Sequence, residues 1–414
     1  MKILVVTHYF WPENFRINDL VAEWVKHGHA VTILTGKPNY PLGKVFSEFL
    51  ANPDRFNEFA GARIIRVPIL ARSQGSIRLF LNYLSFALGA SVFGLIKLRG
   101  YKPDLIFVYE PSPVTVGLPA VLLGKVKKSP VVFWALDLWP ETLSAIGVVK
   151  SEVVLGWVGR LVKFIYNRCE LVLGQSKGFL SSIEKYRDSK QGIRYFPSWA
   201  ETVFSEAAPQ PAPEVNSLAG SFNIVFAGNV GEAQDLPSVV KAAELLRNDP
   251  RVHWWIVGDG RKSDWLAAEV KAKGLSETVH LLGRFPVERM PSFYVAANAL
   301  LVSLKKDPVF SLTIPGKVQS YLLAGVPLLG MLDGEGAAVI NESGSGKAVG
   351  AGDYEGLART VLDMVNTPAA DRQAWGRNGP IYAEREFGRE GLMVRLESML
   401  GEAVHTHRQR LEKS

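Results

Sequence analysis

The feature that most constrains the fold is an alternation of strand-like and helix-like segments that occurs twice along the chain. It begins with the β-branched run Lys2–Thr7, continues with apolar side chains at helical spacing over residues 15–27, and reaches a second strand-like run at Ala30–Thr35. Further strand-like runs lie at residues 63–67, 105–109, 131–135 and 171–173. Such alternation indicates a parallel sheet that is covered by helices on both faces.

Residues 206–218 interrupt this alternation with three prolines and few apolar side chains, a composition typical of a linker. Strand-like runs then resume at residues 223–227, 253–257, 279–282, 299–302 and 327–329. We therefore expect two doubly wound α/β domains, residues 1–205 and 219–383, that face each other across a central cleft. Ligands of such sheets bind beyond the carboxyl ends of the strands.

The charge is distributed unevenly between the two halves of the chain. Residues 1–190 contain 24 Lys and Arg against 14 Asp and Glu, a net charge of +10, whereas the remaining residues contain 23 against 26, a net charge of −3. A basic excess of this kind attracts anionic partners. We expect such a partner to bind the N-terminal domain.

This sequence lacks the usual signals of several classes of protein. Cys169 is the only cysteine among 414 residues, which excludes an intrachain disulfide and a cysteine-rich zinc site. No GxGxxG follows the first strand, and residues 343–348 depart from a Walker loop and are expected to form a turn. We find no nucleic-acid reader motif, no signal-peptide pattern and no uninterrupted apolar run of transmembrane length. We therefore expect a cytoplasmic protein without a nucleic-acid partner.

Glycine and amide side chains follow the first strand of the second predicted domain. This loop contains Gly228, Asn229, Gly231 and Gln234 and opens a helix. Glycines at such a place let the backbone approach a phosphate group, and the helix N-terminus favours negative charge. The alternative is an ordinary turn between a strand and a helix.

Two lysines lie after later strands of the same domain. Lys305 follows the strand at residues 299–302, and Lys317 lies in the first turn of a helix that begins near Pro315 and Gly316. A cation in the first turn is unfavourable against the helix dipole unless an anion is bound there. The two lysines together predict a diphosphate site, and the alternative is a pair of solvated surface charges.

Polar side chains also follow strands of the first predicted domain. Asn14, Arg16 and Asn18 lie where the first strand leads into a helix, and their donors suit an anionic group. Glu110 and Asp137 follow two later strands, where a carboxylate serves as an acid, a base or a ligand of sugar hydroxyls. The alternatives are helix capping by Asn14, a surface Arg16, and carboxylates that cap turns.

Seven motifs occur in order along the chain: FWPE, GHAVTILTGKPNYP, DLWPE, AGNVGEAQ, VGDGR, LLGR and IPGKVQSYLLAGVP. Together they resemble the retaining glycosyltransferases of family 4, in particular the WbuB-like and WcaI-like branch of O-antigen and exopolysaccharide assembly. The resemblance runs nearly from end to end. It implies a GT-B fold in which the second domain binds the donor, the first binds the acceptor, and a final helix at residues 384–414 returns to the first domain.

The resemblance also implies the chemistry. The family uses a nucleotide-diphosphate sugar as substrate and needs no cofactor and no metal, because cationic side chains and helix termini neutralise the diphosphate. Three positions depart from the pattern: the paired glutamates of the family align with Leu312 and Ser320, and its usual acceptor-domain histidine aligns with Leu136. The basic pair that often grips the diphosphate aligns with Asn229 and Gln234, so this role is expected to pass to the two lysines.

These considerations assign a role to each candidate residue. The residues expected to bind the donor are Asn14, Gly228, Asn229, Gly231, Gln234, Gly258, Arg284, Pro315, Gly316 and Ser320. Those expected to bind the acceptor are Arg16, Asn18 and Glu110, and those expected to be catalytic are Asp137, Lys305 and Lys317. The lysines would stabilise the leaving diphosphate in the transition state, while Asp137 would orient hydroxyl groups.

The expected reaction is the transfer of a sugar, with retention of its anomeric configuration, from a UDP-linked donor to a polyprenyl-diphosphate-linked saccharide. A deoxy-aminosugar such as fucosamine is one expected sugar. Residues 72–102 combine apolar and basic side chains, which suits either a peripheral helix on the anionic cytoplasmic face of the inner membrane or a core helix. The alternative functions are a UDP-sugar 2-epimerase of GT-B fold and a non-catalytic sugar-binding protein.

Overall fold

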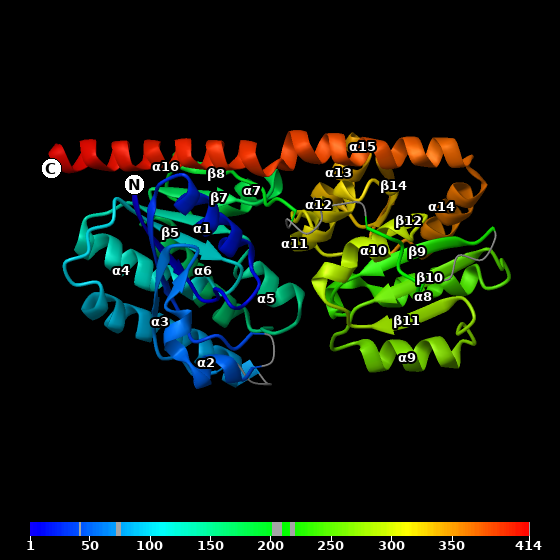
Figure 1. Cartoon of the computed structure of the whole chain (residues 1–414), viewed down its shortest axis with the longest axis horizontal. Coiled ribbons are helices and arrows are strands. Elements are labelled where there is room, and N and C mark those ends of the chain that lie inside the picture. The colour runs from blue at the N-terminus through cyan, green and yellow to red at the C-terminus, as the bar shows by residue number, and fades with distance from the viewer. Residues whose placement is uncertain (41–42, 72–75, 201–208, 216–219, 414) are drawn as a thin grey trace. The chain divides into compact units, whose positions relative to one another are not determined.

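The computed structural model describes residues 1–40, 43–71, 76–200, 209–215 and 220–413, and the chain forms two compact units (Figure 1). Unit 1 comprises Met1–Phe196 together with Glu390–Ser414, and unit 2 comprises Pro197–Arg389. The division therefore falls after Phe196 and before Glu390, whereas the sequence predicted boundaries at residues 205 and 384.

Unit 1 is built on an eight-stranded sheet with the order β3-β4-β2-β1-β5-β6-β7-β8. Its strands are β1 (Lys2–Thr7), β2 (Ala30–Thr35), β3 (Glu58–Phe59), β4 (Ala62–Arg66), β5 (Leu105–Glu110), β6 (Val131–Ala135), β7 (Leu171–Gly174) and β8 (Ile193–Tyr195). Only β3 and β4 pair in antiparallel orientation, and Val5 of β1 lies opposite Ile33 and Phe107. The central strands are buried along almost their whole length, as expected for a parallel sheet covered on both faces.

The helices of unit 1 are α1 (Arg16–Lys26), α2 (Ser47–Ala51), α3 (Ser76–Lys97), α4 (Gly117–Lys127), α5 (Glu141–Ala145), α6 (Glu152–Tyr166), α7 (Lys177–Lys185) and α16 (Arg389–Glu412). The helix predicted at residues 15–27 is confirmed as α1, which buries Ile17, Leu20, Val21 and Trp24. On the sheet, α4 packs against both α3 and α6, so these three helices form one layer.

The C-terminal helix α16 belongs to unit 1, where Figure 1 shows it in red along β8. Its polar side chains pair with loops at the amino ends of several strands. Arg408 lies 2.8 Å from Asp104, and Arg410 lies 2.9 Å from Glu170. These ion pairs, with the buried Leu396 and Leu400, attach the last segment of the chain to the N-terminal sheet.

Unit 2 is built on a fully parallel six-stranded sheet with the order β11-β10-β9-β12-β13-β14. Its strands are β9 (Phe222–Ala227), β10 (Val252–Val257), β11 (Val279–Gly283), β12 (Ala299–Ser303), β13 (Leu328–Met331) and β14 (Gly346–Val349). Its helices are α8 (Leu236–Leu245), α9 (Ser263–Ala272), α10 (Met290–Val295), α11 (Pro308–Ser311), α12 (Gly316–Leu323), α13 (Gly334–Ser343), α14 (Tyr354–Asn366) and α15 (Ala369–Phe387).

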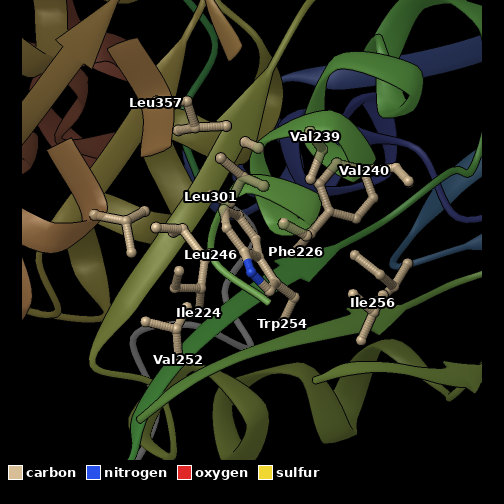
Figure 2. Packing of buried hydrophobic residues seen from close by; sticks show 14 of the residues in the cluster. Ile224, Phe226, Val239, Val240, Leu246, Val252, Trp254, Ile256, Leu301 and Leu357 are labelled. Carbon is tan, nitrogen blue, oxygen red and sulfur yellow. The ribbon is translucent and has the colours of Figure 1, made fainter. Parts of the chain in front are cut away.

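Side chains of β9 alternate between the two faces of this sheet. Ile224 and Phe226 join the buried cluster under α8, whereas Val225 and Ala227 join the cluster on the α12 face. Figure 2 shows Phe226 beside Trp254, with Val239 and Val240 of α8 nearby. Phe226 is thus anchored in the core one position before β9 ends.

The turn predicted within residues 343–348 is present at residues 344–345, between the end of α13 at Ser343 and the start of β14 at Gly346, which lies opposite Leu328. A Cβ at Gly346 would meet the Leu328 carbonyl oxygen at 1.9 Å, so this glycine permits close approach of two strands rather than a turn.

The segment predicted as a linker, residues 206–218, falls within unit 2. Only residues 209–215 of the segment 206–218 are described, and they pack on unit 2. Ala212 is 2% and Val215 4% exposed, and Glu214 lies 2.8 Å from Arg289. Two small apolar side chains at the right spacing therefore suffice to anchor this proline-rich segment.

Candidate functional site

Lys317 places a buried ammonium group near the carboxyl end of β9. It lies in the first turn of α12, and its Nζ has no hydrogen-bond partner among the described residues. The Nζ lies 3.5 Å from the centroid of the Phe226 ring. Burial lowers the pKa of Lys317 to about 7. A buried cation without an anion destabilises the fold, so this arrangement favours a ligand that supplies the negative charge.

Two glycines bring backbone against this lysine. Gly228 has φ +135° and Gly258 has φ +147°, and the Gly228 N–H donates to the Val257 carbonyl at 2.8 Å. A Cβ at Gly228 would meet Cε of Lys317 at 2.6 Å, and a Cβ at Gly258 would meet the Gly228 carbonyl oxygen at 1.8 Å. Only glycine fits at these positions. We call Lys317, Phe226, Gly228 and Gly258 the Lys317 site.

The rest of the loop after β9 is stabilised by one hydrogen bond within the loop and one from β12. The Gly231 N–H donates to Oε1 of Gln234 at 3.2 Å, and the Ser303 hydroxyl donates to the Gln234 carbonyl at 2.6 Å. A Cβ at Gly231 would meet Nδ2 of Asn229 at 2.4 Å, so the amide of Asn229 lies against this glycine. Gln234 therefore shapes the loop, while Asn229 is exposed to solvent.

Lys305 differs from Lys317 because it already has a carboxylate nearby. Its Nζ lies 3.7 Å from Glu232, which also pairs with Lys262 at 2.8 Å, and these cations lower the pKa of Glu232. The Lys305 N–H donates to the Ala233 carbonyl at 2.8 Å. The two lysines were predicted to share one role, but among the described lysines only Lys317 has a buried Nζ without a hydrogen-bond partner.

The remaining predicted donor residues lie at strand and helix ends of unit 2. Pro315 caps α12 and Gly316 begins it, with Gly316 exposed. Ser320, which aligns with a family glutamate, is buried and its hydroxyl lies 3.5 Å from the Gly316 carbonyl of its own helix. Arg284 is exposed directly after β11, and its charge contributes to lowering the pKa of Asp259.

In unit 1, Glu110 is a fully buried carboxyl group at the carboxyl end of β5. Neither of its oxygens has a hydrogen-bond partner of good geometry among the described residues, but the backbone N–H groups of Asp137 and Leu136 lie close enough to the carboxyl group to lower its pKa. Burial, and then the charge of Asp137, raise the pKa of Glu110 well above its ordinary value. Titratable groups in such surroundings often belong to functional sites.

Asp137 is in the opposite situation, because its carboxylate is well satisfied. It accepts hydrogen bonds from the Thr142 hydroxyl at 2.6 Å, the Leu138 N–H at 2.9 Å and the Trp139 indole at 3.1 Å. Burial raises the pKa of Asp137, and these hydrogen bonds oppose the rise. Asp137 thus holds the turn before α5, in agreement with the alternative in which this carboxylate caps a turn. Glu110 receives no comparable side-chain hydrogen bonds among the described residues.

The polar residues after β1 also differ in their hydrogen bonding and exposure. Asn18 is buried, accepts from the Trp11 N–H at 3.1 Å and donates to the Glu13 carbonyl at 2.8 Å, so it holds its own loop. Asn14 is exposed and Arg16 is partly exposed at the start of α1.

Sequence reasoning missed Glu13, which connects two of the recognised motifs. Its carboxylate accepts the N–H groups of Phe10, Asn39 and Tyr40 at 3.2, 2.8 and 2.7 Å. Burial raises the pKa of Glu13 to about 7, although these amides and the charge of Arg66 oppose the rise. Carboxylate-to-amide bonds between distant loops have no local sequence signal beyond the FWPE and KPNY motifs themselves.

No group of three or more His, Cys, Asp and Glu residues within the described part of the chain is arranged to hold a metal ion. The ionisable groups of interest are instead isolated: the Lys317 ammonium in unit 2 and the Glu110 carboxyl in unit 1.

Comparison with known proteins identifies the family. Residues 14–199 match the model of the "Glycosyl transferase 4-like domain", and residues 221–367 match that of "Glycosyl transferases group 1". The chain is 26% identical over 424 residues to WcaI of Escherichia coli (strain K12), named for colanic acid biosynthesis, with 95% of this chain and 98% of WcaI covered. It is 27% identical over 312 residues to the glycosyltransferase WbjE of Pseudomonas aeruginosa, with 71% and 73% covered.

The fold is also that of known glycosyltransferase structures. Anabaena HepE, solved in complex with UDP, superposes with a TM-score of 0.71 at 13% sequence identity, with 97% of this chain and all of HepE covered. The two parallel-sheet units correspond to the two domains of the GT-B fold. Because the two family models together match most of the chain, it belongs to the family 4 glycosyltransferases of GT-B fold.

Proposed function

We propose that this glycosyltransferase moves a sugar from a UDP-linked donor, with retention of anomeric configuration, to a polyprenyl-diphosphate-linked saccharide in polysaccharide assembly. The observation that carries the proposal is the Lys317 site, where a buried ammonium lacks an anion. HepE, which shares the fold, is described in complex with UDP. The names of WcaI and WbjE support a role in cell-surface polysaccharide assembly.

The proposed chemistry at Lys317 is electrostatic. As the bond between the sugar and the diphosphate breaks, negative charge develops on the departing oxygen, and an ammonium in a water-poor site stabilises that charge more than it stabilises the bound donor. Gly228 lets the backbone of the loop lie next to the same phosphate. With the charge neutralised by Lys317 and by the N-terminus of α12, the proposed transfer needs no metal and no cofactor.

On the acceptor side, the proposal assigns to Glu110 the role that was predicted for Asp137. No side chain among the described residues donates to the Glu110 carboxyl group, whereas the side chains of Thr142 and Trp139 and the Leu138 N–H donate to that of Asp137. We propose that Glu110 binds a hydroxyl group of the acceptor. The alternative functions, a 2-epimerase and a non-catalytic binding protein, do not correspond to the two family models that match the chain.

The donor is tested by thermal unfolding of the full chain with UDP, GDP and TDP. A nucleotide at about 100 times its Kd stabilises the native state by about 2.7 kcal/mol, which raises Tm by several degrees. We expect UDP to give the largest rise. Incubation with UDP-sugars and a short-chain polyprenyl-diphosphate saccharide, in EDTA, should then yield a product of retained configuration by NMR. A change at C2 of the sugar without acceptor would contradict the proposal.

We further propose that unit 1 binds the cytoplasmic face of the inner membrane through α3. This helix is long and apolar enough to cross a membrane by length and composition, with a mean hydropathy of 1.8 over its most apolar window. It is nevertheless part of the helical layer on the sheet, because Tyr83, Phe86 and Ala90 are buried. Seven of its large apolar side chains are exposed: Phe80, Leu81, Leu84, Leu88, Val92, Phe93 and Ile96. The buried face of this helix agrees with the core alternative for residues 72–102, and its exposed face supports the proposed membrane surface. Residues 72–75 lie outside the described residues.

Sedimentation with lipid vesicles tests this surface. The full chain should sediment with vesicles that contain phosphatidylglycerol, because exposed apolar side chains and flanking cations such as Lys97 and Arg99 both favour an anionic bilayer. The double variant L88E/V92E should reduce binding about tenfold at unchanged Tm, since both residues are exposed. Equal sedimentation of the variant and the original chain would contradict the proposed surface.

A further inference from the structure

Unit 1 contains a second concave site, far along the sheet from Glu110. It has a volume of about 820 Å³ and lies at the amino ends of β6 and β7, as its lining residues Val131 and Cys169 show. Glu110 lies at the opposite, carboxyl end of β5. Whatever binds here is therefore separate from the group that reacts at the carboxyl ends of the strands.

The walls of this site combine polar residues of α3, α16 and the adjoining loops with apolar side chains from two helices, α4 and α6. Leu118, Val121 and Leu122 lie on one face of α4, and Phe164 projects from α6. Leu122 is 36% and Phe164 41% exposed, so these walls face solvent among the described residues. We call this site the α4–α6 groove and define it by Leu118, Val121, Leu122, Lys125, Phe164 and Arg168.

Cations stand at one end of the groove. Lys125 follows Leu122 by one helical turn, and Arg168 lies 3.7 Å over the ring of Phe164. Neither has a carboxylate within ion-pair distance among the described residues. Arg410, which also lines the groove, is already neutralised by Glu170 at 2.9 Å. The free charge at this end is therefore positive, which suits an anionic headgroup.

The surroundings favour a lipid over a soluble anion. The helical layer of α3, α4 and α6 carries exposed apolar side chains on both sides of the groove, among them Val92 on α3, Val126 on α4 and Trp157 on α6, which is 64% exposed. A soluble phosphate compound would gain nothing from these side chains or from Leu118 and Val121. An amphiphile would bury its chain against them.

We propose that the α4–α6 groove binds one anionic phospholipid, with its hydrocarbon chain along Leu118, Val121 and Leu122 and its phosphate at Lys125 and Arg168. Over this part of α4 the groove runs about 10 Å, long enough for a segment of one acyl chain. The site is independent of sugar transfer, so it would fix how unit 1 sits on a bilayer even in a variant without activity.

Native mass spectrometry of the full chain, released from nanodiscs with equal amounts of phosphatidylcholine and phosphatidylglycerol of matched chains, tests the proposal. We expect one phosphatidylglycerol per chain, retained about tenfold more often than phosphatidylcholine. The variant K125E/R168E should reduce that retention about tenfold. Its matched control is K150E/K185E, which makes the same change in charge at exposed positions of unit 1 outside the groove and should retain the lipid.

Two further experiments distinguish the contribution of the lipid's hydrocarbon chain from that of its headgroup. V121W should fill the groove and remove bound lipid at a Tm close to that of the original chain, and K125A/R168A serves if the charge-reversed variant unfolds. Inorganic phosphate should not displace the lipid. Displacement by phosphate would make the groove a soluble-anion site, and equal retention of both lipids, or full retention by V121W, would overturn the proposed phospholipid.

Discussion

Replacing Lys317 with Met is expected to lower kcat for sugar transfer by about 10²–10³-fold while making the folded protein more stable. The loss follows from removal of the ammonium group that we propose to face the leaving diphosphate, a change of the size seen when a preorganised transition-state donor is removed. The gain in stability follows because the ammonium is buried without a partner and Met fills a similar volume. Replacing a poorly compensated buried charge by an apolar side chain stabilises by about 1–3 kcal/mol.

The stability difference should also depend on pH in a defined direction. Burial lowers the pKa of Lys317 in the folded chain from 10.5 to about 7. Between these two values the unfolded chain holds a proton that the folded chain has lost, so the free energy of unfolding of the original chain rises with pH. K317M should lack this rise between pH 7 and 10.5. Denaturant unfolding at several pH values measures it.

The matched control is Lys306→Met, which removes an exposed lysine close in sequence to Lys305. It should change neither turnover nor stability appreciably. Turnover of K317M within tenfold of the original chain, or a loss of stability in that variant, would contradict the role given to Lys317.

Replacing Gly258 with Ala is expected to cost at least about 3 kcal/mol of stability and most of the donor affinity. The added Cβ would meet the Gly228 carbonyl oxygen at 1.8 Å, and the residue would be held at φ +147°. Two effects contribute to the loss of stability: the strain of a residue with a Cβ at positive φ, and the displacement of the neighbouring backbone. Because Gly228 lies against Lys317, moving it disturbs the Lys317 site itself.

Gly274→Ala is the control for the backbone angle alone. Gly274 has φ +65° at the end of α9, but nothing lies within 4 Å of an added Cβ. It should cost about 1 kcal/mol and leave UDP affinity unchanged. Thermal unfolding and UDP titration of both variants test the difference. Similar losses in the two variants would mean that close packing at Gly258 does not matter.

The fold could be predicted from the sequence because strand–helix alternation is a local signal that both units repeat. The position of Lys317 in the first turn of α12 could also be predicted, and its role in binding an anion stays a prediction that rests on the helix dipole. What the sequence could not separate was Glu110 from Asp137. Both follow buried strands, and only the hydrogen bonds of Thr142, Leu138 and Trp139 to Asp137 distinguish them.

Two other features depended on contacts between distant segments. Gly344 lies in the predicted turn after α13, whereas Gly346 lets β14 approach β13, a contact that the sequence pattern does not reveal. Glu13 has an ordinary loop position, and its role arises from amides of Asn39 and Tyr40 on another loop. In each case the contacting residue is remote in sequence, so periodicity and composition do not predict the contact.

Proton uptake on UDP binding tests the central claim, that Lys317 binds the diphosphate, most directly. At pH 8 the free chain has Lys317 mostly neutral, because its pKa is about 7, and a bound diphosphate would restore the charge. Isothermal titration of the full chain with UDP in two buffers of different ionisation enthalpy should therefore show uptake approaching one proton. K317M should show none. No uptake by the original chain, or equal uptake by K317M, would contradict the claim.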